Sequence, residues 1–580
     1  MQAVEVSYTE FQTTDLEPRL GLIDRLERKK TLLIFITVVL AFSVRVYRLD
    51  SASLSEDETN KVFAVRAYEQ GDFTVNAEHP MMMKMLCYCS VKVCQLFNQG
   101  LGERLGLAIP EETALRLPNA TFGAITVVPL FLFVASLFGF RVGLVTALLW
   151  ASGLNAVWIN RVVKEDTLLV FFMFTGFYLY NCAKQRPASD VSGQERLYAL
   201  AGAAFGMMMA SKYFPHYFGL GVLFYHLAGY DSRDNRGRTP RMTASLFGSM
   251  LLAAVIFNPA LFSPATWRYL LLYLGEDLQT HHGYLIMQTL HDNDLLSMPH
   301  GSPWYFYFLF LAVKLPLPVL IAFLIGLVEV FRHRGPADKI RGYLFLRVML
   351  VFWLVPMSIA GSKFLRYTLS LMPLVYITAA IAIVQMWRVL SSALGKLSLR
   401  AGPAGLAAAA GVAVVFLVSP AVSMIRSLPY PSLYVNALGG NRVGYYFPHD
   451  EFYDLGARES IEYLAQSAPR GATIASDIPG VVEYYLERYN RPDIRSEILS
   501  HPDFSLARSQ PDYVILQRGR VYFENQQTFK LVENTYPIVQ ASTYAGTDAV
   551  RVYMLGDEAA TRHQWAEPND RPLLYRRSSE

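Results

Sequence analysis

TLLIFITVVLAFSVRV, residues 31–46, is an apolar run with one charge, Arg45, and it is followed shortly by the acidic sequence Ser55-Glu56-Asp57-Glu58. A helix of this kind is nearly long enough to cross a lipid bilayer. A polar, charged stretch precedes the run and no small-residue cleavage site follows it, so we expect a retained membrane anchor and not a cleaved signal peptide. Carboxylates beside a membrane are costly to desolvate, and the acidic cluster therefore indicates a site of chemistry.

The rest of the chain has the composition of a membrane protein. Of its 580 residues, 53% are hydrophobic and 17% are charged, whereas soluble domains carry about 25% charged residues. Apolar blocks recur as far as Val422 and a stretch of ordinary soluble character follows. Windows long enough to span a bilayer predict about eleven crossings, near residues 31–48, 119–138, 142–159, 167–183, 197–213, 214–230, 242–261, 304–330, 343–361, 367–387 and 404–424.

The positions of the basic residues predict the orientation. With the N-terminus inside the cell, the Lys/Arg clusters between the predicted spans all fall on the cytoplasmic side of the inner membrane. This pattern holds only if the apolar segment Met81–Phe97 does not cross. We therefore expect that segment to be an amphipathic helix along the outer surface, within a long first outer loop from Leu49 to Leu117.

Four regions follow from this topology. They are a cytoplasmic segment 1–30, a transmembrane domain 31–424, an extracytoplasmic α/β domain 425–560 and a flexible tail 561–580. In the α/β domain the spacing predicts a helix at Glu459–Leu464 and strands at Ala472–Ala475, Tyr513–Leu516 and Val550–Leu555. The domain has no Gly-rich phosphate loop and no Ser-His-Asp arrangement, and we expect it to cover a site in the membrane domain or to recognise an acceptor.

Composition excludes other classes of protein. The net charge of +4 is small for the length, so no nucleic-acid partner is indicated. The four cysteines have apolar neighbours and no paired Cys or His motif, which predicts packing residues and neither a disulfide framework nor a compact zinc site.

A second group of charged residues lies at the predicted outer ends of the helices. Its cations suit a lipid phosphate, because arginine offers a planar fork and lysine a mobile point charge. Simpler interpretations stay open: Asp57 and Glu58 could be a solvated loop, Arg116 could reach along the membrane interface, and Lys363 and Arg366 could bind lipid headgroups. The group comprises Asp57, Glu58, Glu78, Arg116, Arg161, Lys164, Glu165, Asp166, Lys212, Arg268, Lys363 and Arg366.

Several short motifs occur in a familiar order. They are Asp57-Glu58, Glu78-His79-Pro80 with Lys84, Leu115-Arg116-Leu117-Pro118, Arg161 to Asp166, His281-His282-Gly283-Tyr284, Pro303 to Tyr307 with Lys314-Leu315-Pro316, Lys363 to Tyr367, and Tyr445 to Asp450. With these motifs the first 450 residues or so resemble the polyprenyl-phosphate-dependent GT-C glycosyltransferases. The resemblance is to the protein O-mannosyltransferase branch and, more distantly, to the lipid A aminoarabinose transferases.

The resemblance implies a GT-C fold and an inverting transfer of a sugar from a polyprenyl-phosphate donor to a hydroxyl acceptor on the extracytoplasmic side. Asp57 matches the family's catalytic acid residue and would act as general base. Glu58 would orient the site and Asp166 matches a second loop carboxylate. Arg116 matches a position that meets the carrier phosphate, and we add Lys363, Arg366 and Lys212 as candidates for the same contact. Candidates for acceptor or sugar binding are Glu78, His79, His281 and His282.

No cofactor follows from the sequence. The resemblance to the aminoarabinose transferases allows a divalent metal such as zinc near Glu78, His281 and His282, although the spacing of these residues fits no compact ligand signature.

The chain also departs from the family pattern. The loop Ser263–Ser302 is too short for the inserted domain of the eukaryotic O-mannosyltransferases, and His79-Pro80-Met81 replaces His-Pro-Pro. These differences favour a bacterial or archaeal type of enzyme and leave the sugar open, as well as the acceptor, which could be protein Ser/Thr, a lipid or a glycan. A transporter or lipid flippase is the alternative, against which stand the absence of an evident repeat and the position of the charges at helix ends.

Overall fold

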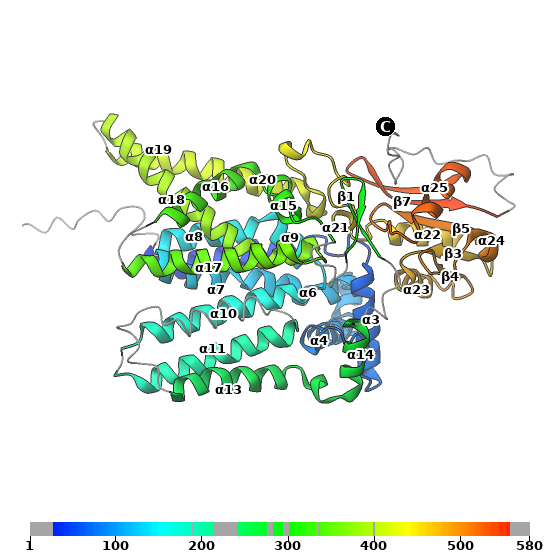
Figure 1. The fold of residues 1–580 in the computed structure, drawn as a ribbon, viewed down its shortest axis with the longest axis horizontal. Coiled ribbons are helices and arrows are strands. Elements are labelled where there is room, and N and C mark those ends of the chain that lie inside the picture. Colours follow the sequence, from blue (N-terminus) through cyan, green and yellow to red (C-terminus); the bar gives the residue numbers. More distant parts are fainter. Residues whose placement is uncertain are drawn as a thin grey trace, which may run out of the picture.

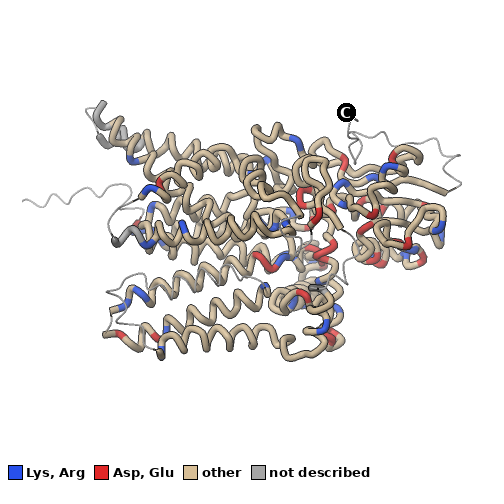
Figure 2. The backbone as a smooth tube through the Cα atoms, in the orientation of Figure 1, with Lys and Arg blue, Asp and Glu red and all other residues tan. Residues whose placement is uncertain are grey.

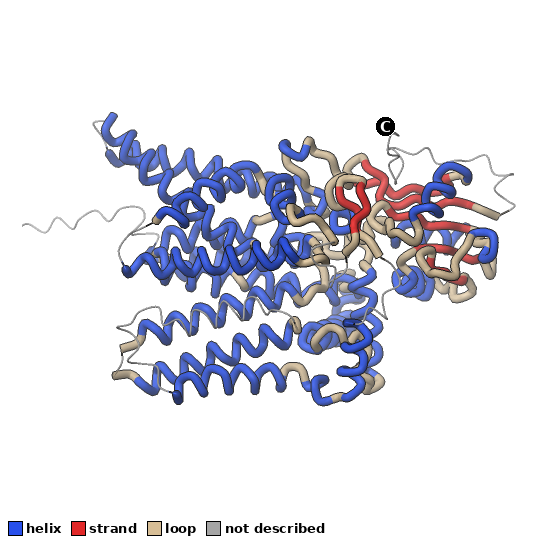
Figure 3. The backbone as a smooth tube through the Cα atoms, in the orientation of Figure 1, coloured by secondary structure: helices blue, strands red, loops and turns tan. Residues whose placement is uncertain are grey.

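The computed structural model describes residues 27–187, 189–213, 240–274, 282–293, 301–333, 337–397 and 401–556. They form a bundle of long helices with a smaller α/β domain at one end (Figure 1 and Figure 3). The predicted span 214–230, His281, most of the segment 1–30 and the tail 561–580 lie outside the described residues.

The helices of the bundle follow the apolar blocks of the sequence. They are α2 (Lys30–Val46), α6 (Glu111–Ile125), α7 (Val127–Phe138), α8 (Phe140–Ser152), α9 (Leu154–Asn160), α10 (Asp166–Gln185), α11 (Val191–Ser211), α13 (Pro240–Ile256), α15 (Phe306–Lys314), α16 (Leu317–Arg332), α17 (Ala337–Ile359), α18 (Met372–Leu397), α19 (Ala401–Ala413) and α20 (Ser419–Ser427).

Five of the helices in the described part of the chain are long and apolar enough to cross a membrane, or six if the bent pair α8 and α9 counts as one span. The predicted number of about eleven therefore stays a prediction. One predicted span, 304–330, is interrupted at Leu315-Pro316, where α15 ends and α16 begins. Proline has no backbone N–H and restricts the residue before it, so a continuous helix is not favoured at this point.

Helices of the first outer loop lie across one end of the bundle. Figure 1 shows α3 (Glu56–Glu69) and α14 (Pro264–Leu274) running across the bundle axis there, with α4 (Met81–Phe97) beside them. The bounds of α4 are those of the predicted amphipathic segment. Its Lys84 is not at a lipid surface, however, because this side chain is buried and donates hydrogen bonds to the carbonyl oxygens of Asn76 and His79 at 2.6 and 2.9 Å.

The C-terminal domain contains a five-stranded sheet in the order β4-β3-β5-β7-β6, in which β3 is parallel to β4 and β5 and the remaining pairs are antiparallel. Its strands are β3 (Thr473–Ser476), β4 (Arg495–Ile498), β5 (Tyr513–Gln517), β6 (Ile538–Tyr544) and β7 (Thr547–Met554), and its helices are α22 (Ala457–Ser467), α23 (Pro479–Arg488), α24 (Leu506–Ser509) and α25 (Gln526–Thr535).

The sequence predicted the three inner strands of this sheet and missed the two at its edges. β5 and β7 are almost wholly buried, whereas β4 and β6 are mostly half-exposed. An edge strand has one neighbour and less hydrophobic cover, so its apolar pattern is weak. Helix α22 covers the predicted Glu459–Leu464.

Charged residues are rare along the middle of the bundle and gather toward its two ends (Figure 2). One gathering lies where the bundle meets the C-terminal domain, beside α3 and the loop before α10. This junction contains most of the candidate residues.

Candidate functional site

Asp57 lies at the start of α3, where the chain turns from the first span into the outer loop. The turn is held by Glu58, whose carboxylate accepts hydrogen bonds from the backbone N–H and the hydroxyl of Ser55 at 3.0 and 3.2 Å. A glutamate at the third position of a helix that reaches back in this way fixes the first turn. Glu58 is buried, whereas 28% of the Asp57 side chain is exposed.

The carboxylate of Asp57 is contacted through a single oxygen. Oδ2 lies 2.5 Å from Lys164 Nζ and 3.4 Å from an Arg366 guanidinium nitrogen, and it accepts a hydrogen bond of 2.5 Å from the Tyr453 hydroxyl. Oδ1 has no hydrogen-bond partner among the residues that the structure describes. Burial alone would raise the pKa of Asp57, but the charges of Lys164, Arg366 and Lys61 outweigh it and hold the pKa well below its usual value.

Glu58 and Arg116 form a buried ion pair directly behind Asp57. Two guanidinium nitrogens lie 2.8 Å from the two carboxylate oxygens of Glu58, and the same guanidinium donates to the carbonyl oxygens of Leu49, Ala52 and Ser53. Arg116 is only 2% exposed. These bonds hold the loop that carries Asp57, and the predicted contact of Arg116 with a carrier phosphate, which stays a prediction, would require them to break.

A second buried ion pair, Lys61–Glu165, also lies near Asp57. Lys61 Nζ is 2.9 Å from Glu165 Oε1, and His79 Nδ1 is 3.9 Å from the same oxygen. Burial lowers the pKa of His79 well below its usual value despite the charge of Glu165, so the imidazole is neutral at pH 7. A neutral imidazole can donate and accept a hydrogen bond, which suits contact with a hydroxyl.

Asp166 and Lys212 form a third pair, with 2.7 Å between Oδ1 and Nζ. The ammonium group also lies 4.5 Å from the ring centre of Tyr367, a cation–π contact. Lys212 is 21% exposed and Arg366 is 16% exposed, so both cations can reach a ligand. Asp166 is buried and positions Lys212.

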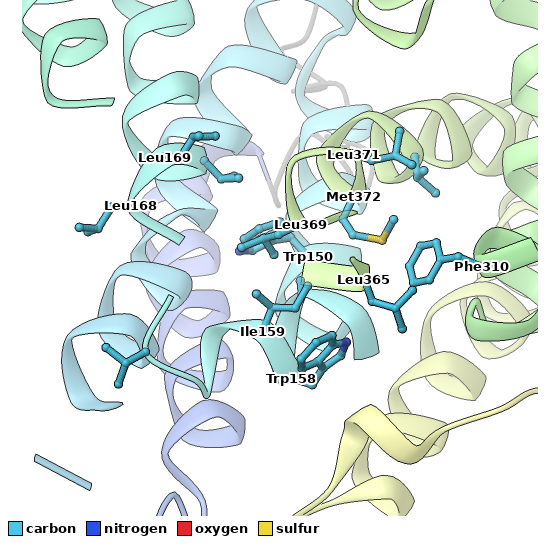
Figure 4. Packing of buried hydrophobic residues seen from close by; sticks show 14 of the residues in the cluster. Trp150, Trp158, Ile159, Leu168, Leu169, Phe310, Leu365, Leu369, Leu371 and Met372 are labelled. Atoms are coloured by element: carbon cyan, nitrogen blue, oxygen red, sulfur yellow. The ribbon is translucent and has the colours of Figure 1, made fainter. Parts of the chain in front are cut away.

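Hydrophobic packing fixes the segment that carries Arg366. This residue lies in the 3₁₀ turn η4 (Leu365–Ser370), which packs against α9. Figure 4 shows Leu365, Leu369 and Met372 in the same cluster as Trp158 and Ile159 of α9. Since α9 leads directly into Lys164, this packing sets both cations of the Asp57 cluster on one rigid core.

Three predicted residues lie away from Asp57. Lys363 is 1% exposed and its ammonium group donates to the carbonyl oxygens of Ser302 and Ala360. Glu78 accepts a hydrogen bond from the Asn76 amide and is half-buried, and burial raises its pKa. His282 pairs with Glu524 of the C-terminal domain at 2.8 Å.

These positions bear on the metal and phosphate hypotheses. Lys363 is too enclosed for direct contact with a carrier phosphate. His282 pairs with Glu524 and Glu78 with Asn76, while His281, the third residue of the predicted metal set, lies outside the described residues. Within the described ranges no group of three His, Cys, Asp or Glu side chains could hold a metal ion.

Sequence reasoning missed two contacts of Asp57. Lys164 belongs to the group of charges predicted at the outer helix ends, but the sequence assigns it no role. Tyr453 follows the motif that ends at Asp450, almost 400 residues from Asp57. A motif shows that a segment is present, but only the fold brings the two segments together.

Comparisons with known proteins support the architecture. The family model described as dolichyl-phosphate-mannose-protein mannosyltransferase matches residues 103–263, and no curated protein sequence matches. ArnT from Cupriavidus metallidurans, in its apo state, is similar over 92% of this chain and 99% of that chain, with 15% identity and a TM-score of 0.52.

A second solved structure agrees. The archaeal oligosaccharyltransferase AglB from Archaeoglobus fulgidus, in complex with an inhibitory peptide and a dolichol-phosphate, is similar over 92% of this chain and 75% of that chain, with 11% identity and a TM-score of 0.50. Together with the family model, these similarities show that the chain has the GT-C fold of membrane glycosyltransferases, which the motifs of its sequence predict.

Proposed function

We propose that the protein is a membrane glycosyltransferase that moves a hexose or pentose from a polyprenyl-phosphate carrier to a hydroxyl acceptor, with inversion at the sugar. The observation that carries this proposal is the Asp57 cluster with the neighbouring Lys212. Asp57 is a partly exposed carboxylate, one of whose oxygens is unpaired within the described structure, and its partner Arg366 is a partly exposed cation. Lys212, also partly exposed, pairs with Asp166 and is close enough to Arg366 for their charges to interact.

The proposed reaction uses the two oxygens of Asp57 differently. The acceptor hydroxyl approaches Oδ1, which takes its proton as the acceptor oxygen forms a bond to the anomeric carbon. The bond from that carbon to the phosphate oxygen breaks on the opposite face of the sugar, and the electron pair leaves with the phosphate. Displacement from the opposite face inverts the configuration, and Arg366 and Lys212 meet the charge on the leaving phosphate.

The low pKa of Asp57 in the free protein makes it a weak base. Binding of the proposed donor would raise this pKa. A lipid phosphate that binds Arg366 draws positive charge away from Asp57. With less positive charge nearby, the pKa of the carboxylate rises toward the range in which it accepts a proton effectively. Donor binding therefore activates the base.

The class of donor is supported by two comparisons. The matching family model is described by its use of dolichyl-phosphate-mannose, and AglB was solved with a dolichol-phosphate. A lipid phosphate fits the membrane bundle of this chain, whose charged cluster lies at one end of apolar helices (Figure 2). We further propose that this end faces the extracytoplasmic side of the inner membrane, with the N-terminus in the cytoplasm.

The acceptor side is proposed from the neighbouring groups. His79, neutral and 23% exposed, is suited to a hydroxyl of the sugar or of the acceptor. Protein Ser/Thr, a lipid and a glycan are the candidate acceptors. Transport or lipid flipping is the weaker proposal, because the charged pairs lie at the helix ends and the fold is that of glycosyltransferases.

The test is release of the polyprenyl phosphate from labelled polyprenyl-phosphate sugars by the purified protein, with candidate acceptors present. We expect Asp57→Asn to lower turnover by roughly two to four orders of magnitude, because general base catalysis is lost. Asp72→Asn is the matched control, since Asp72 is an exposed residue of the same loop whose carboxylate accepts hydrogen bonds from Thr74. Undiminished turnover in Asp57→Asn, or flipping of the lipid without sugar transfer, would overturn the proposal.

A further inference from the structure

Tyr453 reaches Asp57 from a segment that belongs to the C-terminal side of the chain. It follows the short helix α21 (Pro448–Phe452), and its hydroxyl donates a 2.5 Å hydrogen bond to Asp57 Oδ2. Its ring lies edge-on to Trp158 of α9, with 6.2 Å between ring centres. The phenol is therefore held between the bundle and the acidic helix α3.

The backbone at this point is strained. Tyr453 and Asp454 have φ angles of 47° and 65°, in the left-handed region that glycine favours. Two consecutive non-glycine residues in this region are energetically unfavourable, and such conformations persist only where the surrounding contacts hold them.

Asp454 supplies those contacts. Its carboxylate lies 2.9 and 2.5 Å from two guanidinium nitrogens of Arg520, and it accepts a 2.9 Å hydrogen bond from the backbone N–H of Glu56. Arg520 also pairs with the Glu56 carboxylate at 2.6 Å. Glu56 precedes Asp57 in the sequence, so the C-terminal domain contacts the start of α3 directly.

The same strained turn thus makes two connections. Asp454 binds Arg520 and the start of α3, while the Tyr453 hydroxyl donates to Oδ2 of Asp57, the oxygen that also faces Lys164 and Arg366. We propose that Tyr453 is a positioning residue: its phenol keeps Oδ2 occupied so that Oδ1 faces the acceptor, and the Asp454–Arg520 pair of the C-terminal domain holds the phenol in place. This inference rests on the proposed function.

The consequence concerns how the domain acts on the reaction. Loss of the phenol leaves Asp57 with Lys164 and Arg366 but frees its carboxylate to rotate. A hydrogen bond to the charged form also favours that form, so removal of the phenol raises the pKa of Asp57. The other charged or titratable groups near Asp57 are Glu56, Glu58, Lys61, His79, Lys164, Arg366 and Asp450.

The experiment compares Tyr453→Phe with wild type in the assay of polyprenyl phosphate release, over a range of pH. We expect kcat to fall roughly tenfold with KM little changed, because the loss of carboxylate orientation outweighs the gain in basicity. We expect the acid limb of the kcat profile to move up by about one pH unit. Tyr446→Phe is the control, because Tyr446 belongs to the same segment but its hydroxyl donates to the carbonyl of Gly439. We expect it to behave as wild type.

Arg520→Lys tests the connection to the domain. It retains a charge for Asp454 but not the two-nitrogen contact, so we expect the same direction of change as in Tyr453→Phe. An Asp57→Asn variant without activity beside a Tyr453→Phe variant with the wild-type rate and pH profile would overturn this inference and leave the proposed function intact. A fully active Asp57→Asn variant would overturn the proposed function itself.

Discussion

At the scale of single residues, two buried ion pairs determine where Asp57 lies. Glu58–Arg116 holds the turn before α3, and Lys61–Glu165 connects the next turn of the helix to the loop before α10. Neither pair is accessible to a substrate, since all four side chains are almost completely buried. Their charges make the surroundings of Asp57 rigid without taking part in the proposed reaction.

Arg116→Ala separates a structural role from phosphate binding. The substitution leaves Glu58 charged and buried, and breaking a buried pair in this way destabilises a protein by about 3–5 kcal/mol. We expect a large fall in thermal stability of the purified protein, measured by intrinsic fluorescence. A stable variant whose only defect is a higher KM for the donor would instead support the predicted phosphate contact.

Acid should destabilise the protein partly through Asp57. Its pKa is lowered in the folded state, so its contribution to stability is present above the ordinary pKa of about 3.9 and is lost as the pH falls through the folded pKa. We expect the thermal stability of wild type to fall more steeply than that of Asp57→Asn below about pH 4. Equal slopes would contradict the prediction. Asp503→Asn, at an exposed position, should follow wild type.

The residues of the site were predictable to different degrees. Asp57, Arg366 and Lys212 could be proposed from the sequence because each carries a charge close to a predicted membrane span, where charges are expensive unless they have a partner or a ligand. Arg116 satisfies the same rule, yet its partner is Glu58, a side chain of the protein itself. The rule finds charged groups with partners, but it does not distinguish an internal partner from a substrate.

At the scale of helices, α11 and α13 pack through two small residues. A Cβ atom at Gly202 would lie 2.0 Å from the Leu246 carbonyl oxygen, and one at Gly206 would lie 2.2 Å from that of Met250. The spacing is that of the small-xxx-small pattern by which membrane helices approach closely. Because α11 ends beside Lys212, this contact also supports the proposed phosphate site.

Gly202→Ala is expected to push these two helices apart, because the nearest atom is the backbone carbonyl oxygen of Leu246, which cannot rotate away. We expect a loss of roughly 1–3 kcal/mol in stability, measured as a lower melting temperature. Gly248→Ala in α13 is the matched control, since nothing lies within 4 Å of a Cβ atom there. If both variants melt at the wild-type temperature, the result contradicts close packing of α11 and α13 at Gly202.

The elements that the sequence predicts well are those with continuous apolar surfaces. Helix α4 and the buried strands β5 and β7 have strong patterns, whereas the edge strands β4 and β6 do not. Interruptions such as the break between α15 and α16 were less predictable, because a hydrophobicity window averages over a proline. Local pattern therefore predicts the presence of elements better than their breaks.

At the scale of the whole molecule, the C-terminal domain and the first outer loop form one polar interface. Arg488 pairs with Glu112 of α6 at 2.6 Å, and the Tyr485 hydroxyl accepts a hydrogen bond from the backbone N–H of Leu54. With the Arg520 contacts, these interactions attach the domain to the segment that carries Asp57. Sequence could not predict the contacts between the domain and the loop, because each of these joins residues several hundred positions apart.

This attachment constrains the topology in the membrane. Tyr453 contacts Asp57, so the C-terminal domain and the proposed active site must lie on one side of the bilayer. Arg186, which follows α10, lies at the other end of that helix from Asp166. If the site faces outward, cysteine at position 503 in the domain and cysteine at position 186 should be accessible from opposite sides.

The measurement is labelling of intact cells with a membrane-impermeant maleimide, in a chain whose four native cysteines are replaced by alanine. We expect Asp503→Cys to react at once and Arg186→Cys to react only after the membrane is opened, since both positions are exposed in the structure. The reverse result would place Asp57 in the cytoplasm. The basic clusters would then lie on the outer side, opposite to the predicted orientation. Labelling of both cysteines from one side would contradict the bundle itself, because α10 separates the two ends by its full length.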